Sequence, residues 1–152
     1  MKIKLSGGRM PVRAHTWDGG LDLFTPVDVT VPGCTIVGWI KSFVLGGAAD
    51  VGCATIDTLV HAEIPEGTVG LIKSKSGLNV NHGLTADGVI DAHYTGSMKV
   101  KLYNHTRHPY HFKAGDKVAQ LVIVPCLLPE LELVDHLEDT DRGVKGFGST
   151  GR

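Results

Sequence analysis

The C-terminal segment, residues 142–152, carries residue types suited to chemistry on an anion. It combines glycines at positions 143, 146, 148 and 151 with two hydroxyls, one aromatic ring and cations, among them Arg142. Glycine lets backbone N–H groups approach phosphate oxygens closely, and hydroxyl and guanidinium groups add donors. Phe147 suits a flat apolar ligand such as a nucleobase. The alternative is a disordered tail of the kind common at C-termini.

A carboxylate and a tyrosine follow a short apolar run in the segment 88–96. Asp91 comes directly after Ile90, and Tyr94 lies three residues further on. A carboxylate at the end of a strand can take a proton from water, and a tyrosine ring can pack on a sugar. The alternative is an aspartate that starts a turn closed by Gly96.

Two further groups suit phosphate binding. Lys75, Ser76 and Gly77 stand in a Lys/Ser-rich stretch that is either a phosphate-binding turn or a solvated loop. Gln120 is an amide inside an apolar run, so it requires a hydrogen-bond partner, either a ligand or another part of the chain.

Three histidines at positions 105, 108 and 111 are regularly spaced and are candidate metal ligands. Pro109 breaks a helical arrangement of these rings, and the stretch lies between two apolar runs. We therefore expect a polar loop rather than a metal site.

Short strands must position these groups. Glycine and proline punctuate the chain every eight to twelve residues, and residues 98–103 alternate apolar and polar side chains. One short helical turn fits near Ser76–His82. The pattern predicts an all-β fold, either a sandwich, a jelly roll or a barrel. The predicted strands are Lys2–Leu5, Val27–Val31, Thr35–Ile40, Thr55–Glu63, Val69–Lys73, Gly88–Ile90, Ser97–Asn104, Lys117–Val124 and Leu131–Leu137.

Composition narrows the class of protein. The chain of 152 residues has a net charge of −1, so no overall basic field attracts nucleic acid. Its three cysteines lack a CxxC pattern, which argues against a disulfide framework or a zinc site and favours the cytoplasm. No signal peptide or membrane span is expected.

Five blocks in order resemble the motifs of the trimeric dUTPase family, the deoxyuridine triphosphate nucleotidohydrolases. The resemblance runs from about residue 10 to the C-terminus, and the blocks are residues 19–23, 73–78, 88–96, 115–122 and 142–151. It implies a jelly-roll β-barrel over residues 1–141 and a mobile lid over residues 142–152. It also implies a homotrimer with sites between subunits, which hydrolyses dUTP to dUMP and pyrophosphate with Mg²⁺ on the triphosphate.

The resemblance implies a role for each site residue. Asp91 would activate the attacking water, and Tyr94 would pack under the deoxyribose and exclude a 2′-hydroxyl. The backbone from Thr85 to Gly88 would read the uracil edge. The phosphates would be held by Lys75, Ser76, Gly77, Gln120, Arg142, Gly148, Ser149 and Thr150, with Phe147 stacked over the base. No side chain would bind Mg²⁺ directly, although Asp22 would lie near it.

The chain also departs from the family pattern. Lys75 stands where the family has arginine, so the charge is kept without the bidentate fork. Residues 38–54 look like an insertion, either a hairpin or a projecting loop. Two other functions therefore remain open: a related dCTP deaminase, or a nucleotide-dependent regulatory module that binds a partner protein through residues 38–54.

Overall fold

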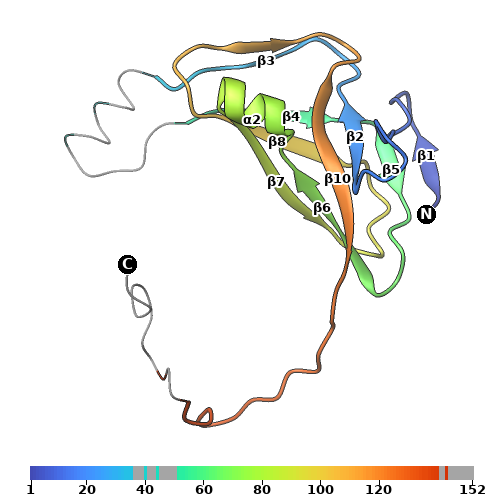
Figure 1. The fold of residues 1–152 in the computed structure, drawn as a ribbon, viewed down its shortest axis with the longest axis vertical. Helices are drawn as coiled ribbons and strands as arrows, with labels where there is room; N and C mark the ends of the chain where they lie inside the picture. Colours follow the sequence, from blue (N-terminus) through green and yellow to red (C-terminus); the bar gives the residue numbers. More distant parts are fainter. Residues whose placement is uncertain (36–39, 41–43, 45–50, 141–142, 144–152) are drawn as a thin grey trace.

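The main body of the chain is a curled antiparallel sheet. The computed structural model describes residues 1–35, 40, 44, 51–140 and 143. In this part of the chain six strands pair in the order β2-β10-β6-β7-β8-β4 (Figure 1). Their bounds are β2 Gly20–Phe24, β10 Lys117–Pro125, β6 Thr68–Lys73, β7 Leu84–Ile90, β8 Lys99–Asn104 and β4 Gly52–Asp57.

Two short ladders complete the barrel-like body. Strand β1 (Ile3–Leu5) pairs with β5 (Val60–Ala62), and β3 (Val29–Val31) pairs with β9 (Tyr110–Phe112). All the ladders are antiparallel, and one hydrophobic core joins residues from both small ladders to the main sheet. The expected all-β, jelly-roll-like fold is therefore confirmed.

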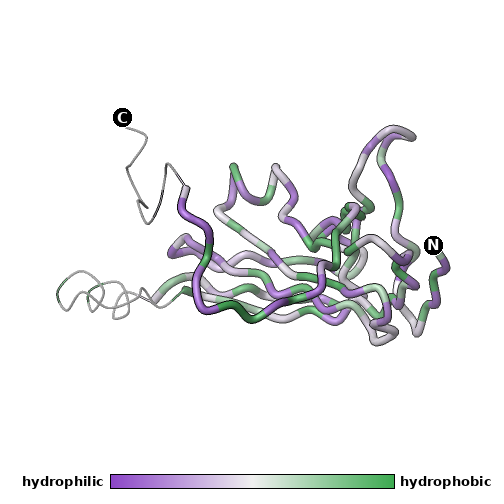
Figure 2. Tube along the Cα trace, turned by 90° about the horizontal axis from the view of Figure 1, so that it is seen from below, coloured by the Kyte–Doolittle hydropathy of each residue, from purple (hydrophilic) through white to green (hydrophobic). Residues whose placement is uncertain are grey.

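The hydrophobic pattern explains which strands are central. Strand β8 alternates exposed lysines with buried Val100, Leu102 and Asn104. Figure 2 shows hydrophilic and hydrophobic positions mixed along the strands of the sheet. Strand β10 is almost wholly apolar because it lies between β2 and β6, where Leu121 pairs with both Leu21 and Ile72. The three leucine and isoleucine side chains are buried in the core.

The expected short helix forms between β6 and β7. Helix α2 spans Ser76–His82 and ends at Gly83, whose φ of 62° places it in the left-handed region. The Gly83 N–H donates to the carbonyl of Asn79 and closes the last turn. Glycine suits this position because it adopts a positive φ without a Cβ clash.

Three features of the predicted strand pattern differ from the structure. The run Thr55–Glu63 is broken between β4 and β5 at Thr58 and Leu59, where Leu59 has a φ of 55°. Residues 20–24, for which no strand is predicted, form β2, which buries Asp22. The strand predicted at Leu131–Leu137 is wrong: Leu131 is 97% exposed and Leu133 100% exposed, and neither pairs with a strand among the described residues.

The chain after β10 forms an extended arm that leaves the body. Residues 126–140 swing away from the sheet in Figure 1, and the apolar side chains on this arm are exposed. Apolar residues in this pattern without a core indicate a segment that another surface covers. No helix among the described residues is long and apolar enough to span a membrane.

Candidate active site

The first part of the candidate site centres on Asp22, a carboxylate buried in strand β2. One of its oxygens lies 2.7 Å from Nζ of Lys117, and the other accepts a hydrogen bond from Nζ of Lys75. Burial alone would raise the pKa of Asp22, but the hydrogen bonds and charges of the two lysines outweigh it and lower the pKa below its usual value. The three side chains together carry one net positive charge, so they can attract an anion.

Gln120 lies beside this cluster on strand β10. It is opposite Asp22 in one ladder and opposite Lys73 in the other. Its Nε2 donates to the carbonyl of Ser74 at 3.0 Å, so the half-buried amide has a partner within the chain. A Cβ atom at Gly20 would lie 2.1 Å from Oε1 of Gln120, so the amide occupies the space that this glycine leaves.

Ser76 and Gly77 begin helix α2 next to the lysine cluster. Lys75 is the N-cap, and its side chain makes no cap hydrogen bond to the helix. The first N–H groups of a helix have no partner within the helix, so they are available to an anion. Nothing lies within 4 Å of a Cβ atom at Gly77, which leaves this turn open. We call Asp22, Lys75, Ser76, Gly77, Lys117 and Gln120 the anion half-site.

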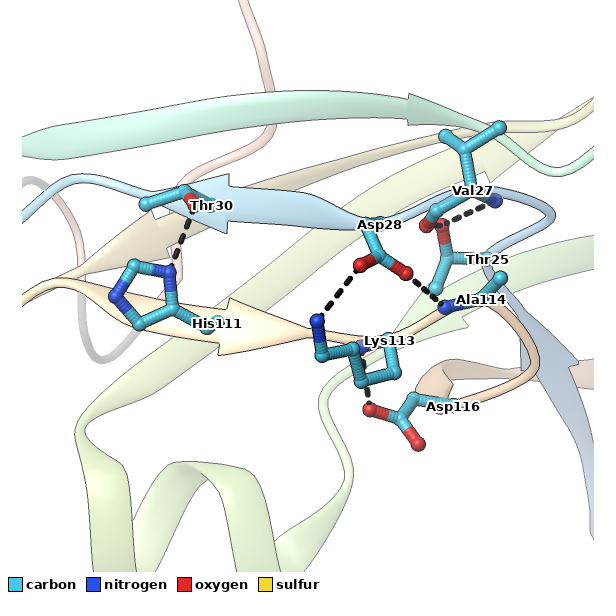
Figure 3. Close-up of polar contacts among 8 residues, drawn as sticks. All are labelled: Thr25, Val27, Asp28, Thr30, His111, Lys113, Ala114 and Asp116. Carbon is cyan, nitrogen blue, oxygen red and sulfur yellow. Dashed lines mark hydrogen bonds and ion pairs between the residues drawn. The ribbon is translucent and has the colours of Figure 1, made fainter.

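The turn at residues 113–116 places Lys117 at the start of β10. Figure 3 shows Asp28 bridging from β3 to this turn: its carboxylate accepts from Nζ of Lys113 at 2.8 Å and from the N–H of Ala114 at 2.9 Å. The N–H of Lys113 also donates to Asp116 at 2.7 Å. The Lys113 hydrogen bond lowers the pKa of Asp28, and the same bond raises the pKa of Lys113.

The second part of the candidate site follows strand β7. Asp91 is exposed directly after the strand, and its carbonyl accepts from the N–H of Tyr94 at 3.1 Å. Asp91 therefore also begins a turn, as the alternative interpretation proposed. Both side chains line a hollow of about 510 Å³ together with Gly67, Thr68, Val69, Ala92, His93, Cys126 and Leu128. We call Asp91 and Tyr94 the carboxylate half-site.

The strand that leads to Asp91 has one open edge. The ladder between β7 and β8 ends at Ala86, whereas the ladder between β7 and β6 continues to Ile90. Gly88 lies in the part that pairs only with β6 among the described strands. Backbone groups on the divergent edge are therefore available to a flat polar ligand. Thr85 stands at the fork, where its hydroxyl lies 2.8 Å from Nε2 of His105.

One chain does not bring the two half-sites together. Ser74, which precedes Lys75, binds Ala86, the third residue of strand β7, whereas Asp91 follows the last residue of that strand. At about 3.3 Å per residue, the five steps from Ala86 to Asp91 separate the two half-sites by roughly 17 Å along the strand. The predicted residues Arg142, Phe147, Gly148, Ser149 and Thr150 lie outside the described residues.

Sequence reasoning missed several of these contacts. Lys117 was not expected in the site, and the pairing of Asp22 with Lys75 depends on a strand register that no local motif reveals. Two of the three spaced histidines bind neighbouring strands: His105 contacts Thr85, and His111 contacts Thr30 at 2.8 Å. The described residues contain no group of three or more metal-ligating side chains.

The chain is similar to known proteins over its whole length. Residues 51–151 match the dUTPase family profile. The deoxyuridine 5′-triphosphate nucleotidohydrolase of Candida glabrata is 33% identical, with 100% of this chain and 95% of that protein covered. The enzyme of the same name from Paramecium bursaria Chlorella virus 1 is 36% identical, with 99% and 96% covered.

Solved structures show the same similarity. The dUTPase of Staphylococcus bacteriophage 80alpha with dUpNHpp superposes with a TM-score of 0.80 and 31% identity, covering 99% of this chain and 98% of that chain. A mutant dUTPase from phage phi11 of S. aureus, described with a structural Mg(II) ion, has a TM-score of 0.72 and 29% identity, covering 91% and 98%.

The fold and the similarity to named nucleotidohydrolases define a jelly-roll nucleotide hydrolase. Within that class, the family profile and the full-length relatives are decisive. The chain belongs to the dUTPase family.

Proposed function

We propose that the chain hydrolyses dUTP to dUMP and pyrophosphate at a site built from both half-sites. The observation that carries this proposal is the net positive cluster of Lys75, Lys117 and Asp22 beside the open turn of α2, in a chain of the dUTPase family. The relatives named above as deoxyuridine 5′-triphosphate nucleotidohydrolases support the same substrate, and they disfavour a dCTP deaminase.

The proposed reaction needs one base and several anion donors. Asp91 takes a proton from water, and the resulting hydroxide attacks the α-phosphorus. The bond from that phosphorus to the bridging oxygen breaks, and pyrophosphate leaves with the electron pair. Lysines, the amide of Gln120 and the N–H groups at Ser76 and Gly77 stabilise the charge on the phosphates, since positioning and electrostatics dominate phosphoryl chemistry.

Recognition of the nucleoside is assigned to the second half-site. The open edge of β7 after Ala86 supplies backbone donors and acceptors for the uracil edge. The ring of Tyr94 packs against the deoxyribose and leaves no room for a 2′-hydroxyl. Both features lie within residues 86–94, the stretch that also carries Asp91, so base, sugar and attacking water are selected together.

Magnesium enters this proposal with the substrate. Both oxygens of Asp22 already accept from lysine ammonium groups, so this carboxylate does not fit a direct metal ligand. The triphosphate offers oxygens, which are the ligands that Mg²⁺ prefers. Mg²⁺ bound there supplies charge neutralisation on the phosphates, and the chain binds the complex.

A complete site requires more than one copy of the chain. The two half-sites stand roughly 17 Å apart on one sheet, so an anion half-site from one copy must meet a carboxylate half-site from another. The exposed leucines on the arm at residues 126–140 supply apolar surface for such an assembly. We assign the assembly as a homotrimer, in which residues 142–152 close over the bound nucleotide.

A regulatory role through residues 38–54 stays a prediction. Most of this segment lies outside the described residues, and residues 52–54 belong to strand β4. Related phage dUTPases are described as controlling transfer of virulence genes, which is a property of those proteins. A chain that bound a partner protein but released no pyrophosphate would favour this role over the hydrolase.

The proposal is tested by pyrophosphate release. Purified protein with Mg²⁺ is compared on dUTP, dCTP, dTTP and UTP, and we expect turnover of dUTP alone. Asp91→Asn should lower turnover by about 10²- to 10⁴-fold while dUTP binding by calorimetry is retained, because the amide cannot accept the proton. Turnover within a few-fold of the unchanged protein would remove Asp91 as the base.

A further inference from the structure

The segment that carries Asp91 and Tyr94 is held in place by hydrogen bonds to residues of other strands and turns. Residues 91–98 connect β7 to β8 without joining a ladder. Instead, the β4–β5 turn holds the end of the segment. Thr58 donates its hydroxyl to the carbonyl of Met98 at 2.7 Å, and the N–H of Met98 donates to the carbonyl of Val60 at 2.8 Å.

Asp57 binds the segment closer to Tyr94. Its carboxylate accepts a hydrogen bond from the hydroxyl of Ser97 and another from the N–H of Leu59 at 3.0 Å. The Ser97 hydrogen bond is the main cause of a lowered pKa of Asp57, so this carboxylate is ionised at neutral pH. Hydrogen bonds to an ionised acceptor are stronger than those between neutral groups.

Tyr94 in turn depends on Ser97. The tyrosine hydroxyl donates to the carbonyl of Ser97 at 3.0 Å. The ring also folds over Gly96, because a Cβ atom there would lie 2.4 Å from the tyrosine oxygen. Fixing Ser97 through its side chain therefore fixes the carbonyl that holds the ring of Tyr94.

His61 contacts Thr95, the residue that follows Tyr94 in the chain. Its Nδ1 lies 2.8 Å from the carbonyl of Thr95, and its Nε2 lies 2.9 Å from the hydroxyl of Ser6. A carbonyl can only accept, so the proton is on Nδ1 and, in the neutral ring, the Ser6 hydroxyl donates to Nε2. Thr95 directly follows Tyr94, so this contact fixes the backbone next to the ring.

The local backbone supports this arrangement. Leu59 has a φ of 55°, a left-handed conformation that is unfavourable for a branched side chain. In this conformation its N–H points to Asp57, and its carbonyl accepts from the N–H of Ser6 at 2.9 Å. The β4–β5 turn is thus bent so that Asp57 and His61 both reach the segment 91–98.

We propose that Asp57 and His61 are positioning residues that set the pose of Tyr94 and thereby the preference for a deoxyribonucleotide over a ribonucleotide. Neither side chain needs to touch the nucleotide. Asp57 acts through Ser97, and His61 acts through Thr95. This inference rests on the proposed function, because it assigns sugar discrimination to Tyr94.

The test compares Asp57→Asn and Ser97→Ala with matched controls. The readout is the ratio of kcat/KM for dUTP to that for UTP, which a purely structural role would not move. We expect the ratio to narrow on the order of tenfold in both variants, since each weakens a charge-assisted hydrogen bond. Ser97→Thr keeps the hydroxyl, so its ratio of kcat/KM values should equal that of the unchanged protein. Glu63→Gln makes the same carboxylate-to-amide change at a surface pair with Lys2 and should leave the ratio unchanged.

A second measurement does not depend on activity. Hydrogen exchange of residues 92–98, followed by mass spectrometry, should be faster in Asp57→Asn and His61→Ala than in Glu63→Gln. A folded Asp57→Asn protein with an unchanged ratio and unchanged exchange would overturn the proposal. An equal loss for dUTP and UTP, together with a lower Tm, would reduce Asp57 to a structural role and also overturn it.

The proposed hydrolase function and the positioning role of Asp57 and His61 can be refuted separately. If the unchanged protein released no pyrophosphate from dUTP, the proposed function would be wrong. In that case the exchange measurement would still decide whether Asp57 and His61 hold the segment.

Discussion

Gln120 occupies the space that Gly20 leaves open, with its Oε1 atom 2.1 Å from where a Cβ atom would stand at that glycine. The two residues lie on adjacent strands, β2 and β10, next to the lysines that bind Asp22. A side chain at position 20 must therefore push the amide away from its hydrogen bond with Ser74. Replacing Gly20 with alanine therefore tests whether Gln120 binds the substrate.

Gly20→Ala should weaken nucleotide binding more than it weakens the fold. Displacing an amide that binds phosphate removes a hydrogen bond to a charged group, so we expect KM for dUTP to rise by roughly tenfold. Gly19→Ala is the matched control, because nothing lies within 4 Å of a Cβ atom there. Steady-state kinetics with both variants would decide the matter, and equal KM values would mean that Gln120 does not bind the substrate.

Asp22→Asn should destabilise the fold in a pH-dependent way. The lysines lower the pKa of Asp22, so the ionised form is stabilising above its ordinary pKa of 3.8, and this contribution is lost as the pH falls through the lower folded-state pKa. Because both lysines are partly exposed, we expect a loss of about 1–3 kcal/mol in the free energy of unfolding at pH 7. Urea titrations should show the difference from the unchanged protein shrinking below about pH 4.

Asp28→Asn is the control for that experiment. It removes a carboxylate–lysine pair that is exposed on both sides, in the arrangement of Figure 3. Exposed pairs are screened by water and contribute little. If Asp28→Asn lowered the free energy of unfolding as much as Asp22→Asn, burial would not explain how the Asp22 cluster stabilises the fold.

The sequence revealed the separate parts of the candidate site, but not how those parts meet in the fold. Asp91 and Tyr94 stand three residues apart, so one motif holds both, and the structure places them on one hollow. The Asp22 cluster joins β2, β10 and the start of α2, and only the strand register shows that these meet. The contacts of Asp57 with Ser97 and of His61 with Thr95 also join residues far apart in the chain, so no local motif reveals them.

The fold shows a similar division. Alternation and punctuation were enough to predict most strands of the main sheet and helix α2. The stretch Leu131–Leu137 has the composition of a strand, but it forms an exposed arm that pairs with no strand among the described residues. A sequence pattern indicates that side chains tend to be covered, and it does not say whether the covering surface lies in the same copy of the chain.

Tyr94 should discriminate sugars through its ring more than through its hydroxyl. Tyr94→Ala removes the surface that excludes a 2′-hydroxyl, so the preference for dUTP over UTP should narrow strongly. Tyr94→Phe keeps the ring and loses only the hydrogen bond to the carbonyl of Ser97, so its effect should be smaller. Competition kinetics with both nucleotides would measure this order, and an unchanged ratio in Tyr94→Ala would move discrimination to another residue.

Activity should require residues from different copies of the chain. The anion half-site lies beside Ala86 and Asp91 is five residues further on, so strand geometry keeps the half-sites roughly 17 Å apart in one copy. A chain ending at Thr140 lacks the glycine-rich segment with its phosphate donors, and Asp91→Asn lacks the base, so each alone should release almost no pyrophosphate. Because the segment 142–152 is rich in glycine and poor in apolar side chains, its removal should leave Tm nearly unchanged.

Co-refolding the two defective chains should restore part of the activity, since some sites would then combine an intact Asp91 with an intact segment from another copy. Light scattering on the active fraction should report a trimer. An active monomer, or a mixture no more active than its parts, would show that each chain builds its site alone.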